Sequence, residues 1–174
     1  MKLKSLIKFL KDEILVPCVI GCTIAIIVNN FIGFTFVNGS SMYPTLEDRN
    51  YLMLNKIGAS DVEKGEIIVF DTTPDAKRKD KIFYIKRVIA TEGDHVEITG
   101  GEVRVNGKTL NEKYTDGSIT EGDINAIVPE GKCFVLGDNR DGSTDSRVFG
   151  FVSEEDVVGT VVTRIFPFKK IEYK

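Results

Sequence analysis

Residues 14–37 form an apolar stretch without an ionised side chain, and this is the strongest hydrophobic pattern in the chain. At about 1.5 Å per residue, a helix of about 20 apolar residues crosses the ~30 Å hydrocarbon layer of a membrane. Asn29 and Asn30 indicate the far interface, so we predict a spanning helix over residues 14–31 that tolerates Pro17 in its first turn. The lysines before the stretch predict a cytoplasmic N-terminus; they are Lys2, Lys4, Lys8 and Lys11.

Two other interpretations of the apolar stretch are weaker. A cleavable export signal also has a basic start and an apolar centre. However, the stretch is long for such a signal, and no small-x-small pair bounded by a polar turn closes it. A buried helix of a globular protein fits poorly with four lysines followed by an uninterrupted apolar run. We therefore assign residues 1–37 to the cytoplasmic N-terminus and transmembrane helix, and place residues 38–174 outside the cell membrane.

Beyond residue 37 the pattern changes to short apolar alternations broken by Gly, Asn and Asp. Such alternation is typical of an antiparallel β domain, because successive side chains of a strand point to opposite faces. The predicted fold class is therefore mostly β, with an antiparallel sheet domain behind one transmembrane helix. The candidate strands are residues 51–55, 66–70, 82–90, 95–98, 102–105, 132–136 and 157–166.

The pair Asn106-Gly107 predicts a tight hairpin turn, because both residues accept the positive φ of a type I′ turn. Residues 102–105 would form its first strand. Residues 111–125 are polar and weakly patterned, and we interpret them as a surface excursion. Together these features predict a smaller β subdomain, over about residues 91–130, inserted into the larger one.

The charge balance argues against a nucleic-acid partner. The net charge is −3 over 174 residues, which leaves no basic footprint. We interpret the charged run at residues 77–81 as a solvated loop, with a contact to lipid headgroups as the alternative. The length beyond the apolar stretch suffices for one compact domain with a modest core, and we expect a monomer.

The three cysteines predict neither a disulfide scaffold nor a metal site. Cys133 has no partner outside the apolar stretch. Cys18 and Cys22 lie about one helical turn apart within the stretch, where we expect them to pack or to face lipid, with acylation of Cys18 as the alternative.

Ser41 follows the apolar stretch directly, in the run Ser-Met-Tyr-Pro-Thr-Leu at residues 41–46, and is a candidate nucleophile at a membrane surface. A serine hydroxyl is a weak nucleophile until a neighbouring base removes its proton. The only histidine, His95, follows Gly93-Asp94 in a turn-like setting, so a Ser/His/Asp triad would rest on one poorly placed residue. A lysine is therefore the leading candidate for the base.

Lys86 is the lysine whose surroundings best suit that role. The pKa of a lysine must fall from about 10.4 toward about 7 or 8 before the amine accepts a proton near neutrality. Apolar burial or a nearby cation can lower it. Lys86 lies in the nearly continuous apolar strand at residues 82–90, next to Arg87, so the sequence suggests both causes. Strand alternation places Lys86 and Tyr84 on one face and Arg87 on the other.

A polar loop at residues 137–147, Gly-Asp-Asn-Arg-Asp-Gly-Ser-Thr-Asp-Ser-Arg, is the third candidate element. Each of the three also has an ordinary structural explanation. Ser41 could be a turn serine, Lys86 an edge lysine with its stem on apolar surface, and the loop a salt-bridged turn. Their joint appearance, in this order behind one apolar span, favours a shared catalytic site.

At this point the chain resembles the bacterial type I signal peptidases of the short, single-span kind found in Gram-positive organisms. The matching segments are the serine box at residues 41–46, the lysine box at residues 86–89 and 93–94, and the Gly-Asp-Asn-Arg box at residues 137–147 with Gly150. The resemblance extends from the apolar span to about Thr163. It departs at residues 90–92, where the family commonly has Gly-Leu-Pro, and at Glu66, where the family commonly has Asp.

The resemblance implies roles for the matching polar residues. Ser41 would be the nucleophile and Lys86 the general base. Ser143 would hold the lysine in line through its hydroxyl. Asp145 and Arg147 would form a supporting ion pair.

The resemblance also implies an oxyanion hole beside Ser41. Its backbone N–H would be one donor, and the second would come from Gly39 or Ser40. Some relatives have a serine hydroxyl at the position of Gly39, and its absence here favours a backbone N–H instead. Asp138 would help to shape the neighbouring loop.

The implied activity is that of a membrane-bound serine endopeptidase, which removes N-terminal signal peptides from exported preproteins through an acyl-enzyme. The cleavage segment would pair as an extra strand, with shallow pockets for small residues at the first and third positions before the cut. The expected partners are these preproteins and membrane lipid, and no metal or organic cofactor is required.

Two other functions remain open from the sequence. An inactive relative could act as an assembly or chaperone factor that binds exported proteins without cutting them, but it would be expected to lack Ser41 or Lys86. A self-cleaving repressor can share the Ser/Lys chemistry, but it needs a DNA-binding helical domain where this chain has an apolar span.

Overall fold

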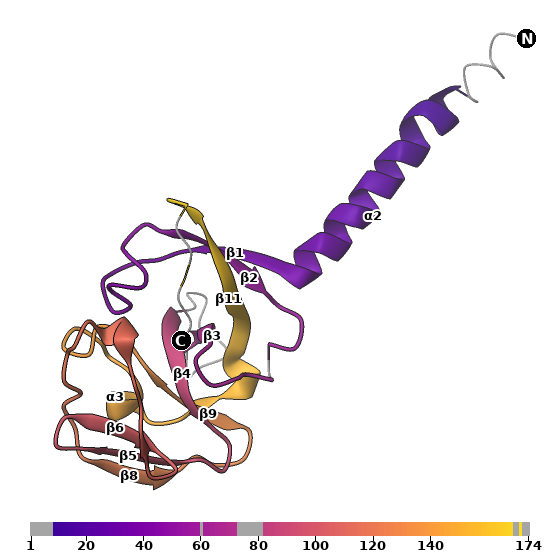
Figure 1. Cartoon of the computed structure of the whole chain (residues 1–174). Coiled ribbons are helices and arrows are strands. Elements are labelled where there is room, and N and C mark those ends of the chain that lie inside the picture. The colour runs from indigo at the N-terminus through magenta and orange to yellow at the C-terminus, as the bar shows by residue number, and fades with distance from the viewer. Residues whose placement is uncertain (1–8, 60, 73–81, 169–170, 172–174) are drawn as a thin grey trace, which may run out of the picture.

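An N-terminal helix projects away from a β-structured body in the computed structural model (Figure 1), which describes residues 9–59, 61–72, 82–168 and 171. The helix begins with the π-helical turn η1 (Leu10–Leu15) and continues as α2 (Val16–Phe31). Among the described residues, one helical segment, Lys11–Phe31, is long and apolar enough to cross a membrane, and none of it is buried against the body. The lysines at positions 2, 4 and 8 and the charged run at 77–81 lie outside the described residues.

Two polar side chains of the helix bond to carbonyls of the helix itself, which would satisfy them in a lipid environment. The Thr23 hydroxyl donates to the Val19 carbonyl at 2.8 Å, and the Asn30 amide donates to the Ile26 carbonyl at 2.8 Å. The helix ends at residue 31 because Ile32 has extended backbone, and the chain passes directly into the first strand.

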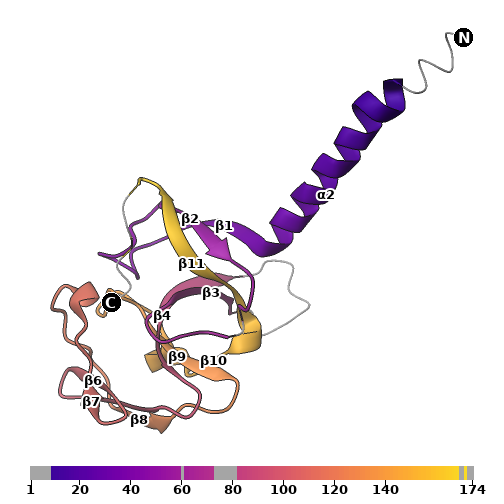
Figure 2. The same ribbon diagram turned by 45° about the vertical axis from the view of Figure 1, so that its right-hand side comes forward.

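In the described part of the chain, the strands form two antiparallel sheets (Figures 1 and 2). The seven-stranded sheet has the order β1-β2-β11-β3-β4-β9-β10, and the four-stranded sheet has the order β7-β6-β5-β8. The mostly β fold class with an N-terminal apolar helix is thus confirmed. The strands of the larger sheet are β1 (Ile32–Phe36), β2 (Tyr51–Asn55), β3 (Ile67–Asp71), β4 (Phe83–Thr91), β9 (Lys132–Leu136), β10 (Val152–Ser153) and β11 (Val157–Phe166).

The smaller sheet and three short helical turns complete the body. The four strands are β5 (His95–Thr99), β6 (Glu102–Val105), β7 (Lys108–Thr109) and β8 (Ile124–Ile127), and the turns are η2 (Lys113–Thr115), α3 (Ser146–Phe149) and η3 (Glu154–Asp156). The predicted hairpin turn between β6 and β7 is confirmed, since Asn106 and Gly107 have φ values of 52° and 74°.

The hydrophobic pattern does not predict β1, β8 or the two-residue β10. Strand β1 is a short apolar run that continues the helix sequence without a break, and periodicity alone does not separate the two. It pairs with β2 through Phe34 and Met53, on the N-terminal side of the domain boundary predicted at residue 37. Strand β8 lies partly in the predicted excursion and pairs with β5.

A shared apolar core joins the two sheets. Ile89 of β4 and Phe134 of β9 pack in one cluster with Val96 and Ile98 of β5 and Val103 of β6. Each of these side chains is at most 3% exposed, and full burial of a side chain of this size contributes about 1.5–3 kcal/mol. Strand β4, which lies between β3 and β9, is therefore surrounded by core, and a charged residue on it is held away from water.

Candidate active site

Ser41 lies in a tight turn after β1 that buried apolar side chains hold in place. Met42 and Leu46 are 1% and 0% exposed and pack in the cluster with β2, β3 and β11. The Leu46 N–H donates to the Met42 carbonyl at 2.8 Å, which closes the turn. Ser41 itself is half-buried and lines a cleft.

The Lys86 amine lies within hydrogen-bonding distance of the Ser41 hydroxyl. Lys86 Nζ and Ser41 Oγ are 2.7 Å apart, although the two residues are 45 positions apart in the chain. Lys86 is 3% exposed, and its Nζ also donates to the Ile85 carbonyl at 3.1 Å. It lies 5.3 Å from the centroid of the Tyr84 ring, as expected for side chains on one face of β4. The structure therefore brings together the two residues that the sequence suggests as nucleophile and base.

Burial lowers the pKa of Lys86 to about 8, because an apolar environment disfavours the charged ammonium form. The carboxylates of Asp145 and Asp138 act in the opposite direction and raise it. Arg87, the cationic neighbour suggested by the sequence, is paired with Asp138, and burial is the main cause of the lowered pKa. A substantial share of the amine is therefore neutral near pH 8.

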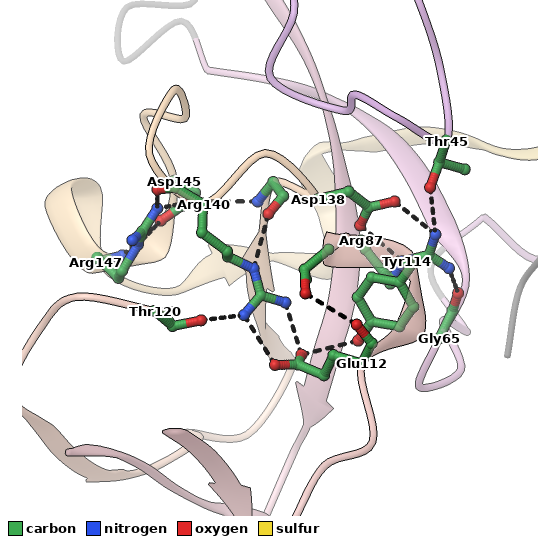
Figure 3. Close-up of polar contacts among 12 residues, drawn as sticks. Thr45, Gly65, Arg87, Glu112, Tyr114, Thr120, Asp138, Arg140, Asp145 and Arg147 are labelled. Carbon is green, nitrogen blue, oxygen red and sulfur yellow. Dashed lines mark hydrogen bonds and ion pairs between the residues drawn. The ribbon is translucent and has the colours of Figure 1, made fainter. Parts of the chain in front are cut away.

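Arg87 of β4 and Asp138 of the loop at residues 137–147 form a fully buried ion pair (Figure 3). Both side chains are 0% exposed. Arg87 Nε donates to Asp138 Oδ1 at 2.8 Å and Nη2 donates to Oδ2 at 2.7 Å, a two-pronged geometry suited to a guanidinium and a carboxylate. Arg87 Nη1 also donates to the Gly65 carbonyl at 2.9 Å. The pair ties β4 to the loop at residues 137–147.

Asp145 and Arg147 form the second ion pair of this loop, as the sequence resemblance implies. Arg147 Nε and Nη2 each lie 2.9 Å from an oxygen of Asp145, which is fully buried. The Gly137 N–H donates to the same carboxylate at 3.0 Å. Burial raises the pKa of Asp145, but the hydrogen bonds from Arg147 and Gly137 outweigh it, so the pKa stays below its ordinary value and Asp145 remains ionised.

Ser143 does not make the contact with Lys86 that the resemblance implies. Within the described residues its Oγ is buried and has no hydrogen-bond partner that meets normal geometry, while its proximity to Asp145 helps to keep the pKa of that carboxyl low. A Cβ added to Gly137 would clash with the Ser143 hydroxyl and lie 2.5 Å from the Ser41 carbonyl oxygen. Glycine at 137 therefore lets the loop pass close to both serines.

Asn139 is a site residue that the sequence reasoning missed. Its side-chain amide donates to the Ser40 carbonyl at 3.1 Å, and its backbone N–H donates to the Ser41 carbonyl at 3.1 Å. Its side-chain oxygen accepts from the Gly142 N–H at 3.1 Å. The loop motif contained this residue, but the contacts join segments about 100 positions apart, and no local pattern predicts them.

The backbone N–H of Gly39 is already used. It donates to the Asp48 carboxylate at 2.9 Å, and Gly39 has a φ of 96°, a conformation that glycine adopts readily. Among the described residues, the N–H groups of Ser40 and Ser41 have no such partner. Of the two candidates for a second oxyanion donor, the geometry thus favours Ser40.

A cleft of about 440 Å³ opens beside the Ser41 hydroxyl. One wall is the end of β1 and the turn that follows it, and the other is the start of β4. Its lining residues include Thr35, Phe36, Val37, Gly39, Met42, Phe83, Tyr84 and Ile85. The walls combine apolar side chains with polar ones, among them Asn38, Ser40 and Thr144, and the size of the cleft suits an extended peptide near the serine.

His95 lies in the smaller sheet, where its Nε2 is 2.8 Å from the Asn125 side-chain oxygen. Ser41 pairs with Lys86 instead, so the geometry favours the lysine over a histidine triad. Within the described residues, no three His, Cys, Asp or Glu side chains are placed to hold a metal ion.

A serine hydroxyl in contact with a buried, partly neutral lysine, beside a peptide-sized cleft, is typical of serine hydrolases that use a lysine base. A family model described as "Signal peptidase, peptidase S26" matches residues 10–166, and the chain belongs to this peptidase family.

Two sequence relatives agree with this assignment. The chain is 36% identical to Signal peptidase IB of Staphylococcus aureus (strain MRSA252), over 92% of each chain. It is 38% identical to a probable signal peptidase I-2 of Synechocystis sp., over 78% of this chain and 64% of that protein. A crystal structure of a signal peptidase I from Enterococcus faecalis V583 aligns with a TM-score of 0.48 and 30% identity, over 58% of this chain and 97% of that one.

Proposed function

We propose that this protein is a membrane-tethered signal peptidase that removes signal peptides from exported preproteins, with Ser41 as nucleophile and Lys86 as general base. The observation that carries the proposal is the 2.7 Å contact between Lys86 Nζ and Ser41 Oγ, in a site where burial lowers the pKa of the lysine to about 8. Membership of the signal peptidase family supplies the substrate class.

In the proposed reaction, neutral Lys86 takes the Ser41 proton as Oγ bonds to the carbonyl carbon of the scissile peptide. The N–H groups of Ser41 and Ser40 would donate to the oxyanion that develops. The Lys86 ammonium then gives its proton to the leaving amine, and the acyl-enzyme remains. Water, deprotonated by the same lysine, attacks the ester, and a proton returns to Ser41 as the signal peptide leaves.

The substrate would bind as an extra strand along β1. This strand is at the edge of the seven-stranded sheet, so one side of its backbone is open to pairing. It continues directly into the cleft and the Ser41 turn. Since α2 precedes β1 without an intervening loop, a membrane-inserted helix would hold the cleft close to a preprotein in the same bilayer, which raises the effective concentration of both.

Cleavage is expected to slow as the pH falls below about 8, because the Lys86 ammonium form does not accept the serine proton. For a group with this pKa, the neutral fraction falls about tenfold per pH unit, so kcat/KM at pH 6 should be about one hundredth of its plateau. The measurement uses the full chain in lipid vesicles and a preprotein whose signal peptide ends in Ala-x-Ala.

A return from pH 6 to pH 8.5 should restore the full rate, which separates titration of Lys86 from acid inactivation. A rate that stays constant down to pH 5 would exclude a lysine base. Glu102→Gln, a substitution in an exposed ion pair of the smaller sheet, serves as the matched control and should leave the profile unchanged.

The proposed orientation can be tested by labelling a cysteine from outside the cell. Glu130→Cys, at an exposed position, combined with Cys18→Ala and Cys22→Ala, is expected to react with a membrane-impermeant maleimide. The parent without Glu130→Cys should remain unlabelled, because Cys133 is fully buried and burial raises its pKa to about 12. Labelling that requires cell lysis would place the β domain in the cytoplasm instead.

A non-catalytic assembly or chaperone factor is the alternative in this family. It would bind the same extended segment along β1, but it would not need a buried lysine on the serine. The preprotein assay distinguishes the two, since such a factor would leave the preprotein intact at every pH.

A further inference from the structure

The polar segment at residues 112–121 lies within the predicted surface excursion, and five of its residues are exposed. The same segment also packs onto the loop at residues 137–147. Thr115 and Thr120 are 5% and 2% exposed, and η2 forms its first turn. Figure 3 shows side chains from this segment in contact with arginines of β4 and of the loop.

Arg140 receives most of these contacts. It is almost fully buried, and its two terminal nitrogens donate to the Glu112 carboxylate at 2.9 and 2.6 Å. It also donates to the Thr120 hydroxyl, and through Nε to the Gly137 carbonyl at 2.9 Å. Burial lowers the pKa of Arg140, but its bonds to Glu112 outweigh this effect, so the guanidinium stays charged.

Tyr114 connects this pair to Arg87, which is also buried. Its hydroxyl donates to the Glu112 carboxylate at 2.9 Å, and its ring centroid lies 4.0 Å from the guanidinium carbon of Arg87. A ring face over a guanidinium is an attractive arrangement. Since Arg87 follows Lys86 on β4, the segment contacts the strand that carries the proposed base as well as the loop.

The same loop also contacts the backbone on either side of the proposed nucleophile. Asn139, next to Arg140, donates to the carbonyls of Ser40 and Ser41 at 3.1 Å each. Glu112 is thus connected to the Ser41 backbone through two adjacent loop residues. A buried arginine fixed by a two-pronged carboxylate has little freedom, because any displacement would leave a charge unpaired in the interior.

We propose that residues 112–121 of the smaller subdomain are a clamp that holds the loop at residues 137–147 against Ser41, with Glu112 and Tyr114 as positioning residues. The effect of the clamp on the reaction rests on the proposed peptidase function, but the contacts that form the clamp do not. Its role is to hold Ser41 Oγ at bonding distance from Lys86 while a substrate enters the cleft.

The first test measures hydrogen exchange in the full chain, in lipid nanodiscs, for the wild type and for Glu112→Gln. Loss of the carboxylate charge is expected to speed exchange across residues 137–147 about tenfold or more, while β2 and β5 keep their rates. Unchanged exchange in the loop, or an equal rise in β2 and β5, would overturn the clamp. Glu102→Gln, which removes a carboxylate from an exposed pair in the same subdomain, should change neither.

The second test measures kinetics with the preprotein substrate. Glu112→Gln is expected to lower kcat about tenfold with KM within about twofold, because the cleft walls are intact and only the serine is less well placed. If the clamp acts through Asn139, then adding Glu112→Gln to the Asn139→Ala variant should lower kcat by less than about a further twofold. If the loss of kcat in the double variant equals the product of the two single losses, the residues act independently, and the coupling between Glu112 and Asn139 is rejected.

Tyr114→Phe covers the case in which Glu112→Gln does not fold. It removes the hydroxyl bond to Glu112 and keeps the ring over Arg87, so a smaller rise in exchange over residues 137–147 is expected, and no rise would count against the clamp. A wild type that cuts no preprotein would refute the peptidase proposal, whereas the exchange result would still decide whether the clamp exists.

Discussion

Replacing Lys86 by Met is expected to lower kcat for preprotein cleavage by about 10³–10⁴-fold, at the upper end of what a general base contributes. The substitution removes the amine that lies 2.7 Å from Ser41 Oγ and that would accept the hydroxyl proton. Ser41→Ala should cause a loss of similar size, and the double variant should be no worse than either single one, because two residues that act as a unit are not additive.

The loss should occur without unfolding. Lys86 is 3% exposed, and Met has a similar length without the penalty of burying an amine, so the free energy of unfolding is expected to stay the same or rise. Lys132→Met, at an exposed position of β9, is the matched control and should cleave at the wild-type rate. Cleavage retained by Lys86→Met would remove the proposed base, whatever the pH profile shows.

Asp138→Ala is expected to lower the free energy of unfolding of the β domain by about 3–5 kcal/mol, because it leaves the Arg87 guanidinium buried and without its carboxylate. Denaturant unfolding followed by circular dichroism measures the change. Activity should fall as well, since Asp138 belongs to the loop that contacts Ser41 through the backbone N–H of Asn139.

Removing both charges distinguishes the cost of an unpaired buried arginine from the contribution of the ion pair itself. In Arg87→Met/Asp138→Leu a large part of the lost stability is expected to return, as apolar residues often replace a buried ion pair at little cost. The exposed pair Glu102–Arg104, whose side chains are 52% and 43% exposed, is the control, and removing Glu102 should cost less than about 1 kcal/mol. A loss below about 1 kcal/mol for Asp138→Ala would show that Arg87 finds another partner.

Local sequence signals were sufficient for most of the elements. The end of the predicted span at residue 31 coincides with the end of α2, and the Asn106-Gly107 turn is where the sequence predicts it. Strand β1 was missed because its apolar residues continue the helix without interruption. An apolar run alone does not show whether its segment is helical or extended.

For the site, the sequence identified side chains but not all of their partners. The apolar neighbours of Lys86 correctly indicated its burial, which depends on the strand itself. Arg87, the expected cationic neighbour of the amine, is paired with Asp138 from a loop 51 positions away, and burial is the main cause of the lowered pKa. The expected bond from Ser143 to Lys86 is absent from the structure, and Asn139 makes backbone contacts that no motif describes.

By itself, the sequence determined the apolar segment, the β alternation and the presence of one serine and one suitably placed lysine, since each depends on neighbours within a few residues. The tertiary structure decided which polar atoms meet. Antiparallel pairing brings β3 and β9 to either side of β4, and the loop after β9 then reaches the turn after β1. Only this closure puts the Lys86 amine on the Ser41 hydroxyl and pairs Arg87 and Arg140 with carboxylates, because long-range contacts depend on the path of the whole chain.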